Sequence, residues 1–190
     1  MTINSNDELK SVLAYEEKVY FGSKGVTAEH KYRKPFKYEM LRYLTLLRKY
    51  EFLLSQEKNT SGVLKKKALS LKIKNCDRKK NMLGLKLSVE IPPEHTGKGL
   101  KICHPGVILN GFVGDNCIFH GNNVLGNKRT CDTDAVPHLG NNVDVGVGAM
   151  IIGSVEIADN CVIGAGAVVT KSFTVPGSVI AGVPAKRTDR

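Results

Sequence analysis

The 190-residue sequence lacks any long apolar run. No stretch approaches the roughly eighteen consecutive apolar residues that a membrane-spanning helix needs. The opening segment, residues 1–7, is polar and has no apolar core of a signal peptide. Because 42% of the residues are nonetheless hydrophobic, we expect a soluble protein with a real core, located in the cytoplasm.

The sequence also lacks the cysteine patterns of a disulfide framework or a zinc site. Its five cysteines are an odd number, none forms a C-x-x-C pair, and no cluster of histidines supplies the missing ligands. We therefore predict free thiols and no metal.

Basic residues outnumber acidic ones in the N-terminal part alone. Residues 1–86 hold 20 of the 28 Lys and Arg residues but only 9 of the 18 Asp and Glu residues, which gives them a formal charge of +11, whereas residues 87–190 carry −1. Basic runs such as 65–67 and 78–80 are typical of solvated helix faces; the alternative is peripheral contact with an anionic membrane, at its inner face, or with an acidic glycan. No helix-turn-helix or metal-finger pattern supports a nucleic-acid partner.

Residues 87–190 contain a six-residue repeat. A period of six fits neither an α-helix nor an ordinary strand, but it fits short strands separated by tight turns, with glycine at the turns. Three such strands form one triangular coil, and stacked coils place the apolar residue of each step in a continuous interior column. Accidental spacing in another β-rich domain is the alternative. The apolar positions are Val107, Val113, Phe119, Leu125, Leu139, Val145, Ile151, Ile157, Ile163, Val169 and Val175.

The repeat is interrupted once, and the N-terminal part has a different pattern. Fourteen residues separate Leu125 from Leu139, so the polar segment 127–137 is predicted to leave the coil as an extruded loop. Residues 7–21, 37–55 and 62–78 carry apolar residues at helical spacing. We therefore divide the chain into a basic α-helical region, residues 1–86, and a mainly β repeat domain, residues 87–190.

Three short segments bring this pattern close to a known family. The sequence Ala-Gly-Val-Pro-Ala at 181–185, and the segments Ile-Pro-Pro at 91–93 and Cys-His-Pro-Gly at 103–106, resemble the serine acetyltransferase family. The chain is most similar to its shorter members encoded with polysaccharide-synthesis genes. The resemblance implies a left-handed parallel β-helix that transfers acetyl from acetyl-CoA to a hydroxyl, in a homotrimer with active sites between subunits.

Acetyl transfer to an alcohol needs a base that titrates near neutral pH, which favours histidine. His104 matches the family's catalytic histidine, and Glu90 matches the acidic residue that fixes its tautomer; a solvent-facing Glu90 is the alternative. His120 is a candidate for substrate contact, or else a surface histidine at a turn. The remaining three, for which we favour structural roles, are His30, His95 and His138.

The acceptor is predicted from three departures from the family pattern. Family members that bind serine carry Asp directly before the catalytic histidine and an Arg-His pair in the loop, where this chain has Cys103, Ala135 and Val136. Without those charges a buried zwitterion would be unpaired, which favours an uncharged acceptor. We therefore predict a sugar hydroxyl of a capsular or other bacterial surface polysaccharide, or of its precursor, with Asp132 and Asp134 in the loop as further substrate contacts.

Two alternatives remain beside the sugar acceptor: serine O-acetylation for cysteine synthesis, and a non-catalytic hexapeptide-repeat scaffold.

Loss of the loop histidine implies a single base, with backbone N–H groups at a glycine-rich turn stabilising the oxyanion. The resemblance further implies acetyl-CoA contacts at Gly126, Asn127, Val147 and Ala165. Lys171 and Lys186 are candidates for contact with the CoA phosphates, or else ordinary surface lysines.

Overall fold

The computed structural model describes residues 1–33, 35–129, 131 and 135–188. The chain forms two compact units, Met1–Leu87 and Ser88–Arg190. No helix in the described part of the chain is long and apolar enough to cross a membrane.

The first unit consists of helices packed on each other, with bounds α1 (Asn6–Phe21), α2 (His30–Arg33), α3 (Pro35–Asn59) and α4 (Val63–Leu87). Ser5 caps α1, because its hydroxyl accepts a hydrogen bond from the Glu8 N–H at 3.1 Å. The short helix α2 was not predicted, and α4 continues nine residues past its predicted end. The buried stripe of α4 continues through Lys80 and Gly84, neither of which reads as an apolar core position.

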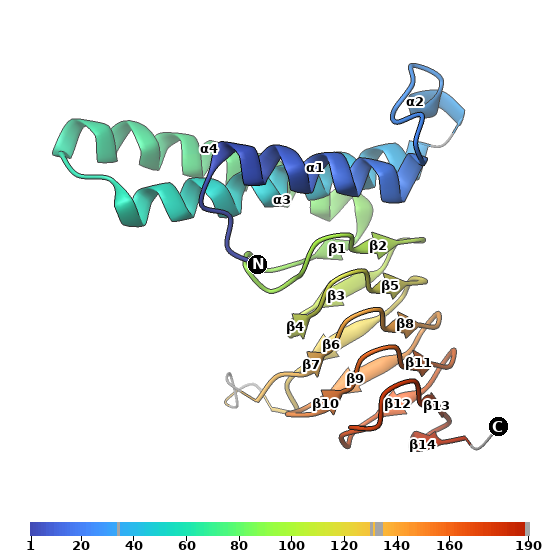
Figure 1. The fold of residues 1–190 in the computed structure, drawn as a ribbon. Helices are drawn as coiled ribbons and strands as arrows, with labels where there is room; N and C mark the ends of the chain where they lie inside the picture. Colours follow the sequence, from blue (N-terminus) through green and yellow to red (C-terminus); the bar gives the residue numbers. More distant parts are fainter. Residues whose placement is uncertain (34, 130, 132–134, 189–190) are drawn as a thin grey trace. The chain divides into compact units, whose positions relative to one another are not determined.

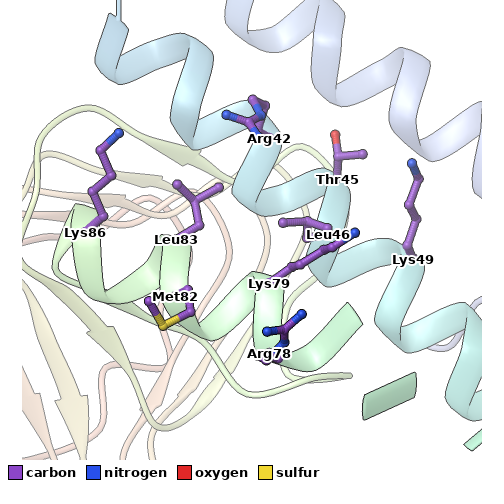
Figure 2. Close-up of a pocket in the computed structure, with 9 residues that line it drawn as sticks. All are labelled: Arg42, Thr45, Leu46, Lys49, Arg78, Lys79, Met82, Leu83 and Lys86. Carbon is purple, nitrogen blue, oxygen red and sulfur yellow. The ribbon is translucent and has the colours of Figure 1, made fainter. Parts of the chain in front are cut away.

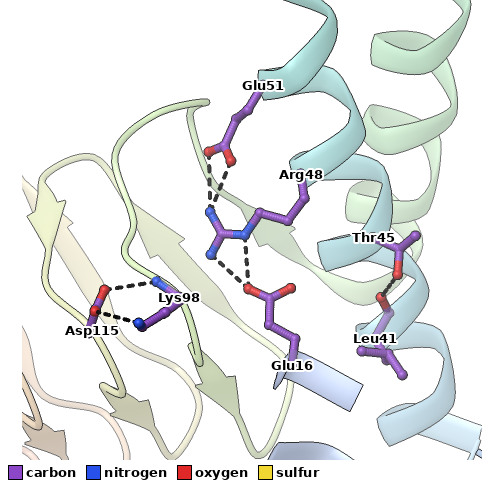
Figure 3. Close-up of polar contacts among 7 residues, drawn as sticks. All are labelled: Glu16, Leu41, Thr45, Arg48, Glu51, Lys98 and Asp115. Atoms are coloured by element: carbon purple, nitrogen blue, oxygen red, sulfur yellow. Dashed lines mark hydrogen bonds and ion pairs between the residues drawn. The ribbon is translucent and has the colours of Figure 1, made fainter. Parts of the chain in front are cut away.

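A buried ion cluster joins α1 to α3 (Figure 3). The guanidinium of Arg48 lies 2.8 Å from a carboxylate oxygen of Glu16 and 3.0 Å from one of Glu51, and all three side chains are fully buried. Burial lowers the pKa of Arg48, but the negative charges of the two glutamates outweigh burial and leave that pKa above its ordinary value. The cluster fixes the packing of α3 on α1 through charges that no hydrophobic pattern reveals.

The second unit is a parallel β-helix of three sheets, visible as stacked rungs in Figure 1. Sheet 1 contains β1 (Val89–Glu90), β3 (Val107–Leu109), β6 (Val124–Gly126), β9 (Met150–Ile152) and β12 (Val168–Val169). Sheet 2 contains β4 (Phe112–Val113), β7 (His138–Leu139) and β10 (Glu156–Ile157). Sheet 3 contains β2 (Lys101–Ile102), β5 (Ile118–Phe119), β8 (Asp144–Val145), β11 (Val162–Ile163), β13 (Val179–Ala181) and the antiparallel β14 (Lys186–Arg187).

The six-residue column forms the interior of this unit. Ten of the eleven predicted apolar positions are at most 5% exposed. Val175 is the exception at 51% exposed, and Phe173 takes the interior place, bridged to Ile157. The last coil is shorter than the earlier ones, so a strict count of six overshoots the core there.

Asparagines turn the chain at the corner between sheets 2 and 3. Asn116, Asn142 and Asn160 have φ between 55° and 62°, a left-handed conformation that asparagine tolerates better than most residues. The Asn142 side-chain amide donates to Oδ1 of Asn160 at 3.1 Å, so this corner is also held from coil to coil. The corners between sheets 3 and 1 and between sheets 1 and 2 carry the predicted site residues.

Candidate active site

His104 lies at the corner that joins sheet 3 to sheet 1, between β2 and β3, with an exposed side chain. On the next coil Gly121 faces it: a Cβ atom at Gly121 would lie 2.7 Å from the Cβ of His104, far inside contact distance. Gly121 also has φ of +118°, which other residues rarely adopt. Glycine is therefore required at this position for two reasons: the backbone conformation and the close approach of His104.

Asn123 holds this corner from the inside. Its side chain is fully buried; Oδ1 accepts from the Gly121 N–H at 2.9 Å, and Nδ2 donates to the Gly146 carbonyl at 2.7 Å. A buried amide is tolerated only with such partners, so Asn123 fixes the turn beside His104. The sequence did hold a signal that we missed: Asn123 is polar at a repeat position that is small and apolar in neighbouring steps, such as Cys117 and Ala149.

His120 forms a pair with an acidic residue that the sequence analysis did not single out. Its Nε2 lies 2.9 Å from Oδ1 of Asp144, and the two side chains are 45% and 42% exposed. His120 and Asp144 belong to neighbouring coils of sheet 3, where Phe119 and Val145 point inward. His120 directly precedes Gly121, so the pair lies on the outer face of sheet 3 next to the His104 corner.

Glu90 lies in β1, with Ile108 as its register partner, and its side chain is exposed. The neighbouring Ser88 carbonyl accepts from the Gly106 N–H at 3.1 Å, so β1 and the His104 corner occupy adjacent coils. Among the described residues no hydrogen bond or ion pair joins Glu90 to His104. The structure brings the two residues into adjacent layers without a hydrogen bond or ion pair between them.

The predicted loop contacts are only partly described. Asp132 and Asp134 lie outside the described residues. Asn127 at the base of the loop donates through its side chain to the Arg129 carbonyl at 2.6 Å. Val136, at the loop's return, is buried at 5% exposed.

The residues predicted to contact acetyl-CoA divide between different edges of the β-helix. Val147 and Ala165 lie at the same sheet 3 to sheet 1 corner as His104, on successive later coils, linked by the hydrogen bond from the Gly166 N–H to the Val147 carbonyl at 2.9 Å. Gly126, Asn127 and Lys171 lie at the other edge of sheet 1, and Lys186 lies in β14. Within one chain, sheet 1 separates the corner of Val147 and Ala165 from Gly126, Asn127 and Lys171, whereas Lys186 belongs to sheet 3.

The thiols fall into two groups. Cys117 and Cys161 are fully buried, whereas Cys103 is half-buried and Cys131 is exposed. Burial raises the pKa of the Cys117 thiol to about 11, so this thiol is a packing group rather than a nucleophile. The described residues contain no group of three or more metal-ligating side chains.

This chain is similar to several known proteins. Residues 137–171 match the family model described as bacterial transferase hexapeptide (six repeats). A serine acetyltransferase of Synechococcus elongatus is 36% identical over 102 residues, which are 52% of this chain and 41% of that protein. One from Helicobacter pylori is 35% identical over 102 residues, 52% of this chain and 59% of that protein. The chain thus spans about half the length of the curated relatives it matches.

Solved structures agree on the fold. The crystal structure of a Neisseria gonorrhoeae serine acetyltransferase superposes with a TM-score of 0.70, covering 98% of this chain and 68% of that chain at 22% identity. The predicted resemblance to hexapeptide-repeat acetyltransferases of the serine acetyltransferase family is therefore confirmed, as is the left-handed β-helix preceded by helices.

The same comparisons correct the predicted acceptor. The relatives at 36% and 35% identity are serine acetyltransferases, so the prediction of a sugar acceptor, and with it of a role in capsule or polysaccharide synthesis, is wrong. The prediction treated the loss of charges at Cys103, Ala135 and Val136 as the loss of all charges that could bind a zwitterion. It overlooked the His120 and Asp144 pair. The comparisons give no support to membrane or glycan contact by the basic helices.

Proposed function

We propose that this chain transfers acetyl from acetyl-CoA to the hydroxyl of serine, with His104 as the general base. The observation that carries the proposal is the exposed imidazole of His104 at a β-helix corner where Gly121 leaves room for it. The acceptor is inferred from the named relatives, which are serine acetyltransferases.

In the proposed reaction His104 accepts the proton of the serine hydroxyl while the oxygen attacks the thioester carbonyl carbon. A C–O bond forms, and the carbonyl electrons move to the oxygen of the tetrahedral intermediate. When the intermediate collapses, the C–S bond breaks and the imidazolium of His104 returns the proton to the departing sulfur. The base is therefore regenerated in each cycle, and the products are O-acetylserine and free CoA.

Two residues are proposed to support His104 without reacting. Asn123 positions it, because this buried amide fixes the turn at Gly121. The role of Glu90 as the carboxylate that orients the imidazole remains a prediction. Glu90 lies one coil away, and hydrogen bonds of catalytic groups often tighten only when substrates bind.

Serine is proposed to bind through its two charges to the pair on the outer face of sheet 3. Asp144 would accept from the ammonium group, and His120, whose Nε2 lies 2.9 Å from Asp144, would donate to the carboxylate when protonated. Lys101 points to the same outer face, since Ile118 is the register partner of both Lys101 and Asp144. The outer face of sheet 3 therefore offers charged groups that could bind an amino acid. The lack of a charged residue at Cys103 had been the argument against an amino-acid acceptor.

Acetyl-CoA is proposed to lie along the corner that holds His104. A Cβ atom at Gly148 or Gly166 would meet no other atom within 4 Å, so the backbone beside Val147 and Ala165 is open to a ligand such as pantetheine. Gly126 is similarly open at the other edge of sheet 1. These positions fit the cofactor only if the two edges come from different copies of the chain.

We propose a homotrimer, which would bring edges of different copies together, and the surface of sheet 1 supports an interface between copies. Ile108, Val124, Met150 and Val168 form one outward row across four coils, since each is the register partner of the next. Ile108 and Met150 are 42% and 44% exposed. Such a continuous apolar row is typical of an interface between copies.

The test measures thiol release from acetyl-CoA with L-serine as acceptor, together with mass spectrometry of the product. We expect O-acetylserine from the natural chain, and a rate at least about 100-fold lower for His104→Ala. L-Alanine, which lacks the hydroxyl, serves as the control acceptor. Equal rates for the natural chain and the variant would refute the role of His104, and thiol release without O-acetylserine would refute the acceptor.

A further inference from the structure

The first unit contains a groove that the proposed reaction does not use (Figure 2). It runs between α3 and α4, has a volume of about 720 Å³, and is lined by residues of these two helices only. Figure 2 shows the helices running in opposite directions along it, with Arg42 facing the end of α4 that carries Lys86. The groove is large enough for a small organic molecule.

Cationic side chains stand at both ends of the groove. Arg42 and Lys86 lie at one end, and Lys49, Arg78 and Lys79 lie at the other. None of the residues that line the groove is acidic. Seven residues separate Arg42 from Lys49 along α3, so the two cationic ends are about 10 Å apart.

These cations are poorly neutralised within the described part of the chain. Arg42 is paired with Glu39 at 2.8 Å, and Arg78 donates to the neutral side chain of Asn75 at 3.3 Å. Among the described residues, no carboxylate lies within 4.0 Å of Lys49, Lys79 or Lys86. Like charges that line one groove repel one another, and a bound anion would relieve the repulsion.

The middle of the groove is apolar. Leu46 on α3 and Met82 and Leu83 on α4 lie between the two cationic ends. Met82 is 65% exposed although it is a large apolar side chain. A ligand that covers this floor would remove apolar surface from water while its ends meet the cations.

We propose that this groove binds a small organic dianion, with a carboxylate or phosphate group at each end of an apolar body about 10 Å long. One anionic group meets Arg42 and Lys86, and the other meets Lys49, Arg78 and Lys79. The apolar body lies on Leu46, Met82 and Leu83. This site is separate from the acetyl-transfer site in the second unit and does not depend on the activity proposed there.

Isothermal titration calorimetry with linear dicarboxylates of graded length tests the proposal on the full chain. Sebacate, whose carboxylates are about 11 Å apart when extended, is expected to bind at least about tenfold more tightly than succinate, which is too short, and than decanoate, which has one charge. Tripolyphosphate, which has charge but no apolar body, is also expected to bind more weakly. Equal affinities along the series, or tighter binding of tripolyphosphate, would overturn the proposed shape of the site.

Matched variants locate the binding. Lys49→Ala with Lys79→Ala removes one cationic end and is expected to lower the affinity for sebacate about tenfold or more. Lys66→Ala with Lys67→Ala removes the same charge from the exposed start of α4, outside the groove, and is expected to leave the affinity within about twofold. Equal losses in both double variants would show a general effect of net charge and would overturn the site, as would no saturable binding by the natural chain.

Discussion

The Nε2 atom of His120 lies 2.9 Å from Oδ1 of Asp144, one coil beyond the His104 corner. His120 directly follows β5, Asp144 lies in the neighbouring strand β8, and both side chains remain partly open to solvent. A paired imidazole and carboxylate beside the exposed His104 form the surface that we propose meets both charges of serine.

Asp144→Asn should therefore weaken serine binding more than it slows acetyl transfer. The amide keeps the size of the side chain but loses the charge that would meet the ammonium group, so we expect KM for serine to rise about tenfold with a much smaller change in kcat. Steady-state kinetics with serine varied at saturating acetyl-CoA would measure this. Asp159→Asn, at a different corner of the β-helix, is the control, and an unchanged KM in Asp144→Asn would remove Asp144 from the site.

Gly121→Ala should displace the side chain of His104 and lower the activity, although His104 itself is unchanged. The new methyl group would lie 2.7 Å from the Cβ of His104, so the imidazole must move, and we expect kcat to fall about 100-fold. Gly177→Ala is the matched control: this glycine also has positive φ, but a Cβ there meets no atom within 4 Å, and it lies outside the proposed substrate and cofactor sites. Comparable kcat values in the two variants would show that the contact with His104 does not matter.

Much of the fold could be predicted from the sequence because the β-helix is a local repeat. Each interior residue is specified by a six-residue count, and the count fails only where the last coil shortens and Phe173 replaces Val175. His104 was predicted from the resemblance of the segment Cys-His-Pro-Gly at 103–106 to the serine acetyltransferase family, and its role stays a prediction. Asn123 was detectable in principle, as a polar residue in a small apolar column.

The contacts between distant residues could not be predicted in the same way. His120 and Asp144 are 24 positions apart, and their meeting depends on the loop insertion, which changes how many residues separate the coils. Arg48 and Glu16 are 32 positions apart on different helices. Neither pair follows from a periodic pattern, since a charged residue on a helix or strand reads as solvent-facing until its partner is known.

Arg48→Met should strongly destabilise the helical unit. Methionine fills a similar volume, but Glu16 and Glu51 would keep their buried charges with no cation between them. Breaking a buried pair in this way costs about 3–5 kcal/mol of unfolding free energy. Urea denaturation followed by circular dichroism measures the loss, with the exposed Arg42→Met as the control. A loss below about 1 kcal/mol would mean that the cluster contributes little.

Cys117 predicts how the stability of the β-helix changes in alkaline solution. Burial raises the pKa of its thiol from an ordinary value of 9.0 to about 11, so the folded state holds this proton more tightly than the unfolded state. The resulting stability is fully present below pH 9.0 and is lost as the pH rises through 11, by roughly 2–3 kcal/mol.

Cys117→Ala removes this titration, and with it the contact of the thiol with the Gly140 carbonyl at 3.2 Å. We expect the variant to be less stable than the natural chain at pH 8, because a buried side chain has been shortened. The difference should narrow between pH 9.0 and 11, since only the natural chain has a thiol that ionises in the unfolded state while burial keeps it protonated in the folded state. Other groups that titrate in this range are common to both proteins and cancel in the comparison. Urea denaturation across the range, with the exposed Cys131→Ala as control, measures the difference, and a gap that stays constant with pH would contradict the proposed burial of the ionising thiol.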